Sequence, residues 1–332
     1  MVILAFSKKE KVSAEQGDDD MIQYVEHKEK VMKILVTGGT TFVSRYIAEF
    51  LARQGNDVFV LNRGTKRQLN GVHLIKADRH DIGDALRFHK FDVVIDVTSY
   101  TGVDVSDLLD GLGEFMKYIL ISSSAVYPET LQQPFSEDQP CGPNIHWGAY
   151  GTNKIEAEQT LLQRVPDAYI IRPPYLYGPM NNLYREAYIF DCAEKNVPVY
   201  IPENMNMQLH FYHVRDLCMF IEKLIDTTPA EHIFNVGNSE TVSIREWVTE
   251  CFKVFGKTPE FVKVNSDIPV RTYFPFRDYE YILDVTKQNA ILKPSITLEK
   301  GLSESYLWYK DHGKDVLKKD YFTVISEKIA RK

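Results

Sequence analysis

The chain is poor in cysteine and carries no excess of positive charge. Its four cysteines include no CxxC pair, so the sequence supports neither a disulfide framework nor a metal site, and we expect reduced thiols in a cytoplasmic protein. The formal net charge is −7 over 332 residues. Bulk charge therefore gives no reason to expect nucleic acid or an anionic membrane as a partner. These cysteines are Cys141, Cys192, Cys218 and Cys251.

Long apolar runs and internal repeats are also missing. The longest hydrophobic runs have the length of a strand and fall short of the roughly 18 residues that a membrane span needs. Met1–Phe6 is apolar but too short for a signal-peptide core, and no small-residue cleavage site follows it. The remainder of 1–31 is largely charged and polar, so we interpret 1–31 as an N-terminal extension.

From Met32 onward, short apolar runs alternate with segments of helical periodicity. The runs are almost continuously hydrophobic, which is typical of parallel strands covered on both faces. This alternation predicts right-handed crossovers and an α/β fold of the Rossmann type with a doubly wound parallel sheet. The predicted strands are Lys33–Thr37, Asp57–Leu61, His73–Lys76, Asp92–Val97, Tyr118–Ser122, Tyr169–Arg172 and His232–Val236, and the first predicted helix is Phe42–Arg53.

The length suits about two domains. We expect a dinucleotide-binding domain over 32–178, with 211–236 returning to it. The segments 179–210 and 237–332 are mixed and less periodic, and predict a smaller mixed α/β substrate domain.

The first strand meets the first helix through glycine. Gly38 and Gly39 let the backbone approach a pyrophosphate, which then lies against the N-terminal N–H groups of the helix. Thr41 and Ser44 stand where the second and third glycine of the dinucleotide fingerprint usually fall, and both are small. A simple tight turn is the alternative interpretation. Phe42 and Val43, in the first turn of the helix, complete the expected phosphate contacts.

The second strand ends in the residues expected to contact the cofactor's ribose. An acidic residue there favours NAD, but this chain has Asn62 and Arg63, and an arginine favours NADP by pairing with the 2′-phosphate. Alternatively, Arg63 is simply solvated, so NAD and NADP both stay open. Asp78 follows the third strand and can accept a hydrogen bond from the adenine amino group. The other expected cofactor contacts are Arg79, Val97, Thr98, Ser122 and Pro173.

A serine, a tyrosine and a lysine suggest redox chemistry at a carbinol carbon. Ser123 follows the fifth strand, and Tyr150 and Lys154 lie four residues apart, on one face of a predicted helix. A tyrosine hydroxyl has a pKa of about 10 and is a poor base at neutral pH. A neighbouring ammonium favours the phenolate, and Ser123 can hold the substrate oxygen.

The motifs together resemble the extended short-chain dehydrogenase/reductase family over 32–310. They are TGGTTFVS at 37–44, SSSAVY at 122–127, YGTNK at 150–154, RPPYLYGP at 172–179, FYHVRDL at 211–217 and FNVGNSETVSIREW at 234–247. GGTTF, VLNRG at 60–64 and FPFRDYEYILD at 274–284 resemble the branch of chloroplast stem-loop-binding proteins and bacterial epimerase-like relatives.

This resemblance implies several functional features. Members are NAD(P)-dependent sugar-nucleotide epimerases, dehydratases and reductases, with Ser123, Tyr150 and Lys154 as the catalytic set and Pro173 beside the nicotinamide. It also implies a homodimer formed through helices around Asp104–Gly113 and Tyr150–Leu162.

The chain departs from the family pattern on the substrate side. Ser124 stands where dehydratases begin an acidic pair, so 4,6-dehydration is not expected. Tyr175 replaces a frequent asparagine, and Leu209 replaces an arginine that binds the diphosphate. Arg277 is our preferred substrate-side cation, although a structural ion pair is an equally good explanation for it. The other candidate cations are Arg185, Arg215 and Arg271.

Three functions follow from these observations. The first is redox-neutral epimerisation of a nucleotide-sugar with a retained NAD(P). The second is NADPH-dependent carbonyl reduction, which Arg63 and the missing diphosphate arginine favour. The third is a non-catalytic RNA-associated scaffold, as the stem-loop-binding relatives suggest, although the net charge is negative.

Overall fold

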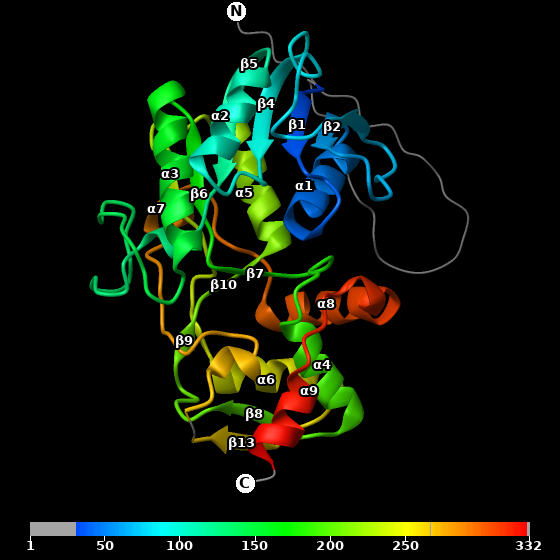
Figure 1. Ribbon diagram of the computed structural model, residues 1–332, viewed down its shortest axis with the longest axis vertical. Coiled ribbons are helices and arrows are strands. Elements are labelled where there is room, and N and C mark those ends of the chain that lie inside the picture. The colour runs from blue at the N-terminus through cyan, green and yellow to red at the C-terminus, as the bar shows by residue number, and fades with distance from the viewer. Residues whose placement is uncertain (1–30, 266, 331–332) are drawn as a thin grey trace, which may run out of the picture. The chain divides into compact units, whose positions relative to one another are not determined.

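A seven-stranded parallel sheet is the largest sheet of this computed structural model, which describes residues 31–265 and 267–330, and it lies in the upper half of the view in Figure 1. The strand order is β3-β2-β1-β4-β5-β6-β11. The predicted α/β fold with a doubly wound sheet is therefore confirmed. The predicted N-terminal extension lies almost wholly outside the described residues. The strands are β1 Lys33–Thr37, β2 Asp57–Asn62, β3 His73–Lys76, β4 Lys90–Asp96, β5 Glu114–Ile121, β6 Tyr169–Arg172 and β11 Ile233–Asn235.

Two strands begin earlier than hydrophobicity predicts. β4 starts at Lys90 and β5 at Glu114, two and four residues before the predicted starts. The two residues are register partners, and their side chains form an exposed ion pair of 2.8 Å. A polar strand start at the rim of a sheet carries no hydrophobic signal, so the sequence pattern missed it.

Helices cover both faces of the sheet. α1 (Phe42–Arg53) and α5 (Val214–Thr227) pack on one face, and α2 (Gly102–Gly111) and α3 (Ala149–Arg164) on the other. Within β1, Ile34 and Val36 join the first cluster and Leu35 the second, because successive strand side chains point to opposite faces. Among the described helices, none is long and apolar enough to cross a bilayer.

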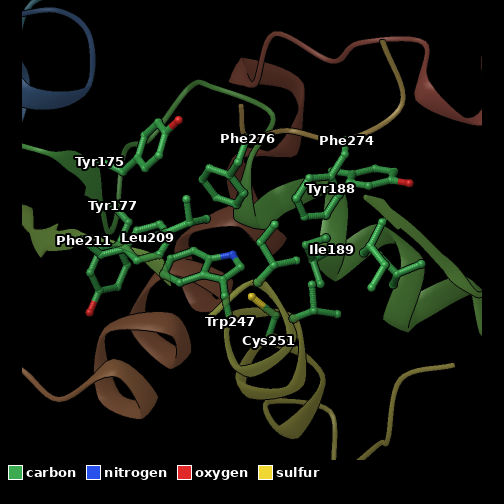
Figure 2. Close-up of a cluster of buried hydrophobic side chains, with 14 of the residues drawn as sticks. Tyr175, Tyr177, Tyr188, Ile189, Leu209, Phe211, Trp247, Cys251, Phe274 and Phe276 are labelled. Atoms are coloured by element: carbon green, nitrogen blue, oxygen red, sulfur yellow. The ribbon is translucent and has the colours of Figure 1, made fainter. Parts of the chain in front are cut away.

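The rest of the described chain packs around a separate core rich in aromatic side chains (Figure 2). At its centre the rings of Phe211 and Trp247 stack with 3.7 Å between their centroids. Three two-stranded pairings, β7–β10, β8–β13 and β9–β12, support this core. The remaining strands are β7 Tyr175–Tyr177, β8 Val199–Pro202, β9 Gln208–Leu209, β10 Phe211–His213, β12 Val242–Ser243 and β13 Phe261–Val264. The remaining helices are α4 Glu186–Lys195, α6 Ile244–Lys253, α7 Thr286–Ile291, α8 Leu298–His312 and α9 Tyr321–Val324, with short turns η1 Ser124–Val126, η2 Val270–Thr272, η3 Gly313–Asp315 and η4 Ile325–Ile329.

Candidate active site

The turn between β1 and α1 has a geometry that only glycine can adopt without strain. Gly38 and Gly39 have φ angles of +91° and +78°. A Cβ atom at Gly39 would lie 2.4 Å from Cγ1 of Val60, and one at Gly38 would lie 2.9 Å from Oγ of Ser44. The missing side chains leave the backbone bare directly before the N-terminus of α1. This cradle fits a dinucleotide pyrophosphate.

Buried hydrogen bonds fix the shape of the turn. The Thr37 hydroxyl donates to Asp96 at 2.7 Å and accepts from the backbone N–H groups of Val97 and Thr98 at 2.9 and 3.1 Å. On the other side, the Asn62 amide donates to the carbonyl oxygen of Gly38 at 2.7 Å. Asn62 and Thr98, both expected at the cofactor, thus also support the turn itself.

Arg79 holds the loop after β4. Its guanidinium donates to the Asp96 carboxylate and the Thr98 and Ser99 hydroxyls at 2.6 to 2.9 Å, and to the Asp104 carbonyl at 2.8 Å. Burial alone would raise the pKa of Asp96, but Arg79 and three hydroxyl donors hold it below its ordinary value. An ionised Asp96 therefore anchors Arg79, which was predicted as a cofactor contact.

Arg63 and Asp78 lie exposed after β2 and β3. Within the described chain, Arg63 makes no hydrogen bond or ion pair, so its guanidinium is available to a ligand. The Asp78 carboxylate accepts only the N–H of His80, at 3.1 Å. Both side chains are accessible where the sequence predicted the ribose and adenine contacts.

The structure brings the predicted catalytic side chains together. Tyr150 lies in the first turn of α3, and its side chain is 39% exposed. Burial of the hydroxyl raises the pKa of Tyr150, whereas a hydrogen bond with Ser123 and the charge of Arg185 act to lower it. Ser123 lies before η1, where its Oγ also accepts from the N–H of Ala125 at 3.1 Å.

Lys154 is buried and donates hydrogen bonds to backbone carbonyls. Its side chain is 2% exposed, and Nζ donates to the carbonyl oxygens of Ser99 and Ile121 at 2.7 and 2.9 Å. Nζ also lies 5.0 Å from the ring centroid of Tyr100, whose ring is 6.5 Å from that of Tyr150. Burial lowers the pKa of Lys154 to about 8, although nearby carboxylates, Asp96 first, oppose the shift. No pattern in the sequence indicated that Tyr100 lies near both residues.

Four cations lie close to one another, and the charge of one of them, Arg185, acts on Tyr150. The Arg277 guanidinium lies 4.6 Å from the Trp147 ring, and that of Arg185 lies 4.8 Å from the Tyr175 ring. Burial lowers the pKa of Arg271, and the charges of Arg185 and Arg277 add to the effect. Burial also lowers the pKa of Lys319, and the same three arginines lower it further. In residues 31–265 and 267–330, none of the four cations forms an ion pair with a carboxylate.

Arg215 differs from these four cations. It forms an ion pair with Glu304 at 3.2 Å and donates to the Tyr46 hydroxyl at 3.4 Å. Its charge is neutralised inside the protein, so Arg215 is a structural residue. We call the group Arg185, Arg271, Arg277 and Lys319 the cation cluster.

Comparison with known proteins identifies the family. The model of the NAD dependent epimerase/dehydratase family matches residues 34–110 and 105–237. The chain belongs to this family. The membership inferred from the sequence motifs is confirmed, and the family binds NAD(P).

Relatives of this epimerase/dehydratase chain have several named activities. The chloroplast stem-loop binding protein of 41 kDa b from Arabidopsis thaliana is 30% identical, over 87% of this chain and 81% of that protein. A dTDP-4-dehydrorhamnose reductase from Streptomyces griseus is 24% identical, over 82% and 92%. The UDP-glucuronic acid 4-epimerase of Bacillus cereus, solved with NAD, has a TM-score of 0.69 at 20% identity, covering 86% of this chain and 98% of the epimerase. At that identity the likeness shows the shared fold.

A buried polar network links α3, the helix that contains Tyr150, to the sheet. Glu158, one turn after Lys154, accepts from the Ser122 hydroxyl and from two nitrogens of Arg172, at 3.0 and 2.6 Å. Arg172 continues to the Tyr127 hydroxyl at 2.8 Å. The network joins α3 to Ser122, directly after β5, and to β6. The Glu158–Arg172 pair was not predicted from the sequence, although a carboxylate on the buried face of α3 could have indicated it.

The remaining predicted substrate residues are mostly enclosed. Ser124 is 4% exposed, and its N–H donates to the Pro173 carbonyl at 3.0 Å. Tyr175 is 4% exposed and faces the cation cluster through Arg185. Leu209 is fully buried in the aromatic core, where Figure 2 shows it beside Phe211.

Proposed function

We propose that this chain is an NAD(P)-dependent epimerase of a nucleotide-activated sugar. One observation carries the proposal: a partly exposed tyrosine feels the charge of Arg185, which belongs to a cluster of four cations that have no carboxylate partner in the described chain. Unpaired, partly desolvated arginines favour binding of a phosphate or diphosphate group. The tyrosine is placed to exchange a proton with a hydroxyl of the attached sugar.

The chain's own residues handle the proton and the substrate oxygen. Hydride acceptance and return is the chemistry that a bound dinucleotide supplies. The Tyr150 phenolate takes the hydroxyl proton as the carbon is oxidised and returns it when the carbon is reduced, so no net proton or electron is consumed. Ser123 holds the reacting oxygen and its hydrogen bond acts to lower the pKa of Tyr150, and the buried Lys154 ammonium supplies positive charge that favours the phenolate form.

Epimerisation suits this site better than dehydration. Water loss from the sugar needs an additional acid and base near the catalytic serine. Ser124 and Ala125 occupy those places and are 4% and 0% exposed, and neither can exchange a proton at neutral pH.

The test combines cofactor analysis with product analysis. Freshly purified protein is denatured, and any released dinucleotide is identified by mass spectrometry. The native protein is then incubated with single UDP- and dTDP-sugars without added cofactor, and products are followed by NMR. We expect a stoichiometric dinucleotide and one epimeric pair. A site that purifies empty, together with no epimer from any sugar, would contradict the proposal.

Arg63 favours a second candidate, NADPH-dependent carbonyl reduction. Its exposed, unpaired guanidinium is suited to a 2′-phosphate. If it has that role, Arg63→Ala weakens NADPH binding about tenfold or more while NADH binding changes little, as for the loss of a charge-assisted phosphate contact. Equal weakening of both dinucleotides, measured by titration calorimetry, would show that Arg63 does not contact the 2′-phosphate.

A further inference from the structure

A cavity of about 750 Å³ opens beside the glycine turn, between segments far apart in the sequence. On one side it is lined by Thr40–Phe42, at the start of α1, and by Lys66–Asn70, in the loop after β2. On the other side it is lined by residues of α8, η3 and the strand-like segment that follows. These are Trp308, His312, Lys314, Asp315 and Leu317, which we call the C-terminal wall.

Positive charge dominates the cavity. Arg45, Lys66, Arg67 and Lys314 line it, and Asp315 is the single carboxylate among its described lining residues. None of these cations forms an ion pair elsewhere in the described chain. The Nε atom of Arg45 is buried without a hydrogen-bond partner. Such a group is costly to bury, which indicates that a ligand satisfies it.

The cavity also offers hydroxyl and aromatic surface. Lys66 Nζ donates to the Thr41 hydroxyl at 3.2 Å and so bridges the loop after β2 to the start of α1. In the C-terminal wall, the rings of Trp308 and His312 stack in parallel with 4.9 Å between their centroids. Cations, hydroxyls and a flat ring together suit a phosphorylated nucleoside.

The C-terminal wall is tied to the body of the protein. The N–H of Leu317 donates to the Asn182 carbonyl at 2.8 Å, and Leu317 forms a β-bridge with Leu183. The next residue, Lys318, pairs with Asp191 at 3.0 Å. Because these contacts anchor the C-terminal wall, Lys314 can stay at a constant distance from the glycine turn.

We propose that the C-terminal wall is the second side of the dinucleotide site. Lys314 holds the adenosine-side phosphates of the cofactor together with Arg45, Lys66 and Arg67, opposite the backbone cradle of Gly38 and Gly39. The cofactor is then enclosed between the sheet domain and the chain's C-terminal segment. This arrangement deepens the proposed function, because an enclosed dinucleotide stays bound through both halves of a redox-neutral cycle.

The test measures binding of ADP, NAD⁺ and NADP⁺ to cofactor-stripped full-length protein by titration calorimetry. In Lys314→Ala, we expect dissociation constants to rise about fivefold, as for the loss of one phosphate contact, with a weaker dependence on salt. Lys310→Ala is the matched control, since Lys310 is exposed in the last turn of α8, just before η3, but does not line the cavity. Melting temperatures check that both variants are folded.

The three ligands locate the contact. Equal weakening for all three assigns Lys314 to the shared diphosphate, and weakening confined to NADP⁺ assigns it to the 2′-phosphate; either result supports the proposal. Constants within twofold of the wild type for every ligand would overturn it. The test needs no sugar substrate. The proposed role of Lys314 can therefore be confirmed even if the epimerase proposal fails, and it can fail even if the epimerase proposal is confirmed.

Discussion

At the scale of single residues, the proposed chemistry depends on a tyrosine and a lysine that do not share a hydrogen bond in the structure. Both identified donations from Lys154 go to backbone carbonyls, so it can act on Tyr150 only through its charge. Burial raises the pKa of Tyr150, so the free protein holds a protonated tyrosine at neutral pH. Binding of a positively charged nicotinamide ring would shift this balance towards the phenolate.

Tyr150→Phe tests the role of this hydroxyl. We expect turnover to fall by about 10² or more, the usual contribution of a general acid or base, because the ring remains but cannot exchange a proton. Mass spectrometry of the denatured variant should find the same amount of dinucleotide as in the wild type. Undiminished turnover would exclude Tyr150 as the base.

Lys154 predicts a specific dependence of stability on pH. The folded protein loses this proton at a pH of about 8, below the ordinary value of 10.5 in the unfolded chain. Between these pH values the unfolded chain binds more protons, so the unfolding free energy of the wild type rises with pH. Lys154→Met lacks this titration. Relative to the variant, the wild type should gain about 1.4 kcal/mol per unit of pKa shift. Urea unfolding from pH 7 to 10 measures both proteins, and parallel curves would contradict a lowered pKa.

At the scale of elements, the glycine turn makes a sharp prediction. Gly39→Ala places a methyl group against Val60 at a positive φ, and should abolish dinucleotide binding and cost about 2 to 4 kcal/mol of stability. Gly55→Ala is the matched control, since Gly55 has φ +80° but no atom within 4 Å of the added carbon. That control should lose only about 1 kcal/mol and bind the dinucleotide normally. Calorimetry and thermal unfolding distinguish the two effects.

The sequence predicted elements better than it predicted the walls of the site. The predicted bounds of β1, β3 and β6 match the observed ones. For β1 and β6 the reason is that buried parallel strands are largely apolar, whereas β3 is an edge strand with mostly exposed residues. Tyr150 and Lys154 were found through their helical spacing. Lys314 and Lys319 were missed, because Lys314 lies in the short turn η3 and Lys319 in the irregular segment after it, and the position of both depends on tertiary contacts. No local pattern indicates that such a residue faces a site formed by another part of the chain.

At the scale of the whole molecule, the negative net charge bears on the RNA hypothesis. The chain shares 30% identity with a protein named for stem-loop binding, but its own formal charge is −7. Most of the unpaired cations described above lie in the cation cluster or line the cavity beside the glycine turn, the two proposed ligand sites.

RNA binding can be measured directly by fluorescence anisotropy with a labelled stem-loop. We expect a dissociation constant no tighter than about 10⁻⁶ M at physiological salt, within the range of non-specific binding. Binding well below that value, weakening steeply between 50 and 200 mM salt, would instead support the RNA-associated scaffold.

The path of the chain through the sheet has a consequence for protein engineering. All residues of β6 are buried, and β6 pairs with β11 at the edge of the sheet. Between these two strands, the chain leaves the sheet and contributes part of the aromatic core. A fragment that ends at Pro179 would therefore expose a hydrophobic strand edge, which promotes aggregation. A chimera that exchanges substrate preference between relatives must accordingly replace two inserts, one on each side of α5 and β11, since a single crossover would leave the sheet incomplete.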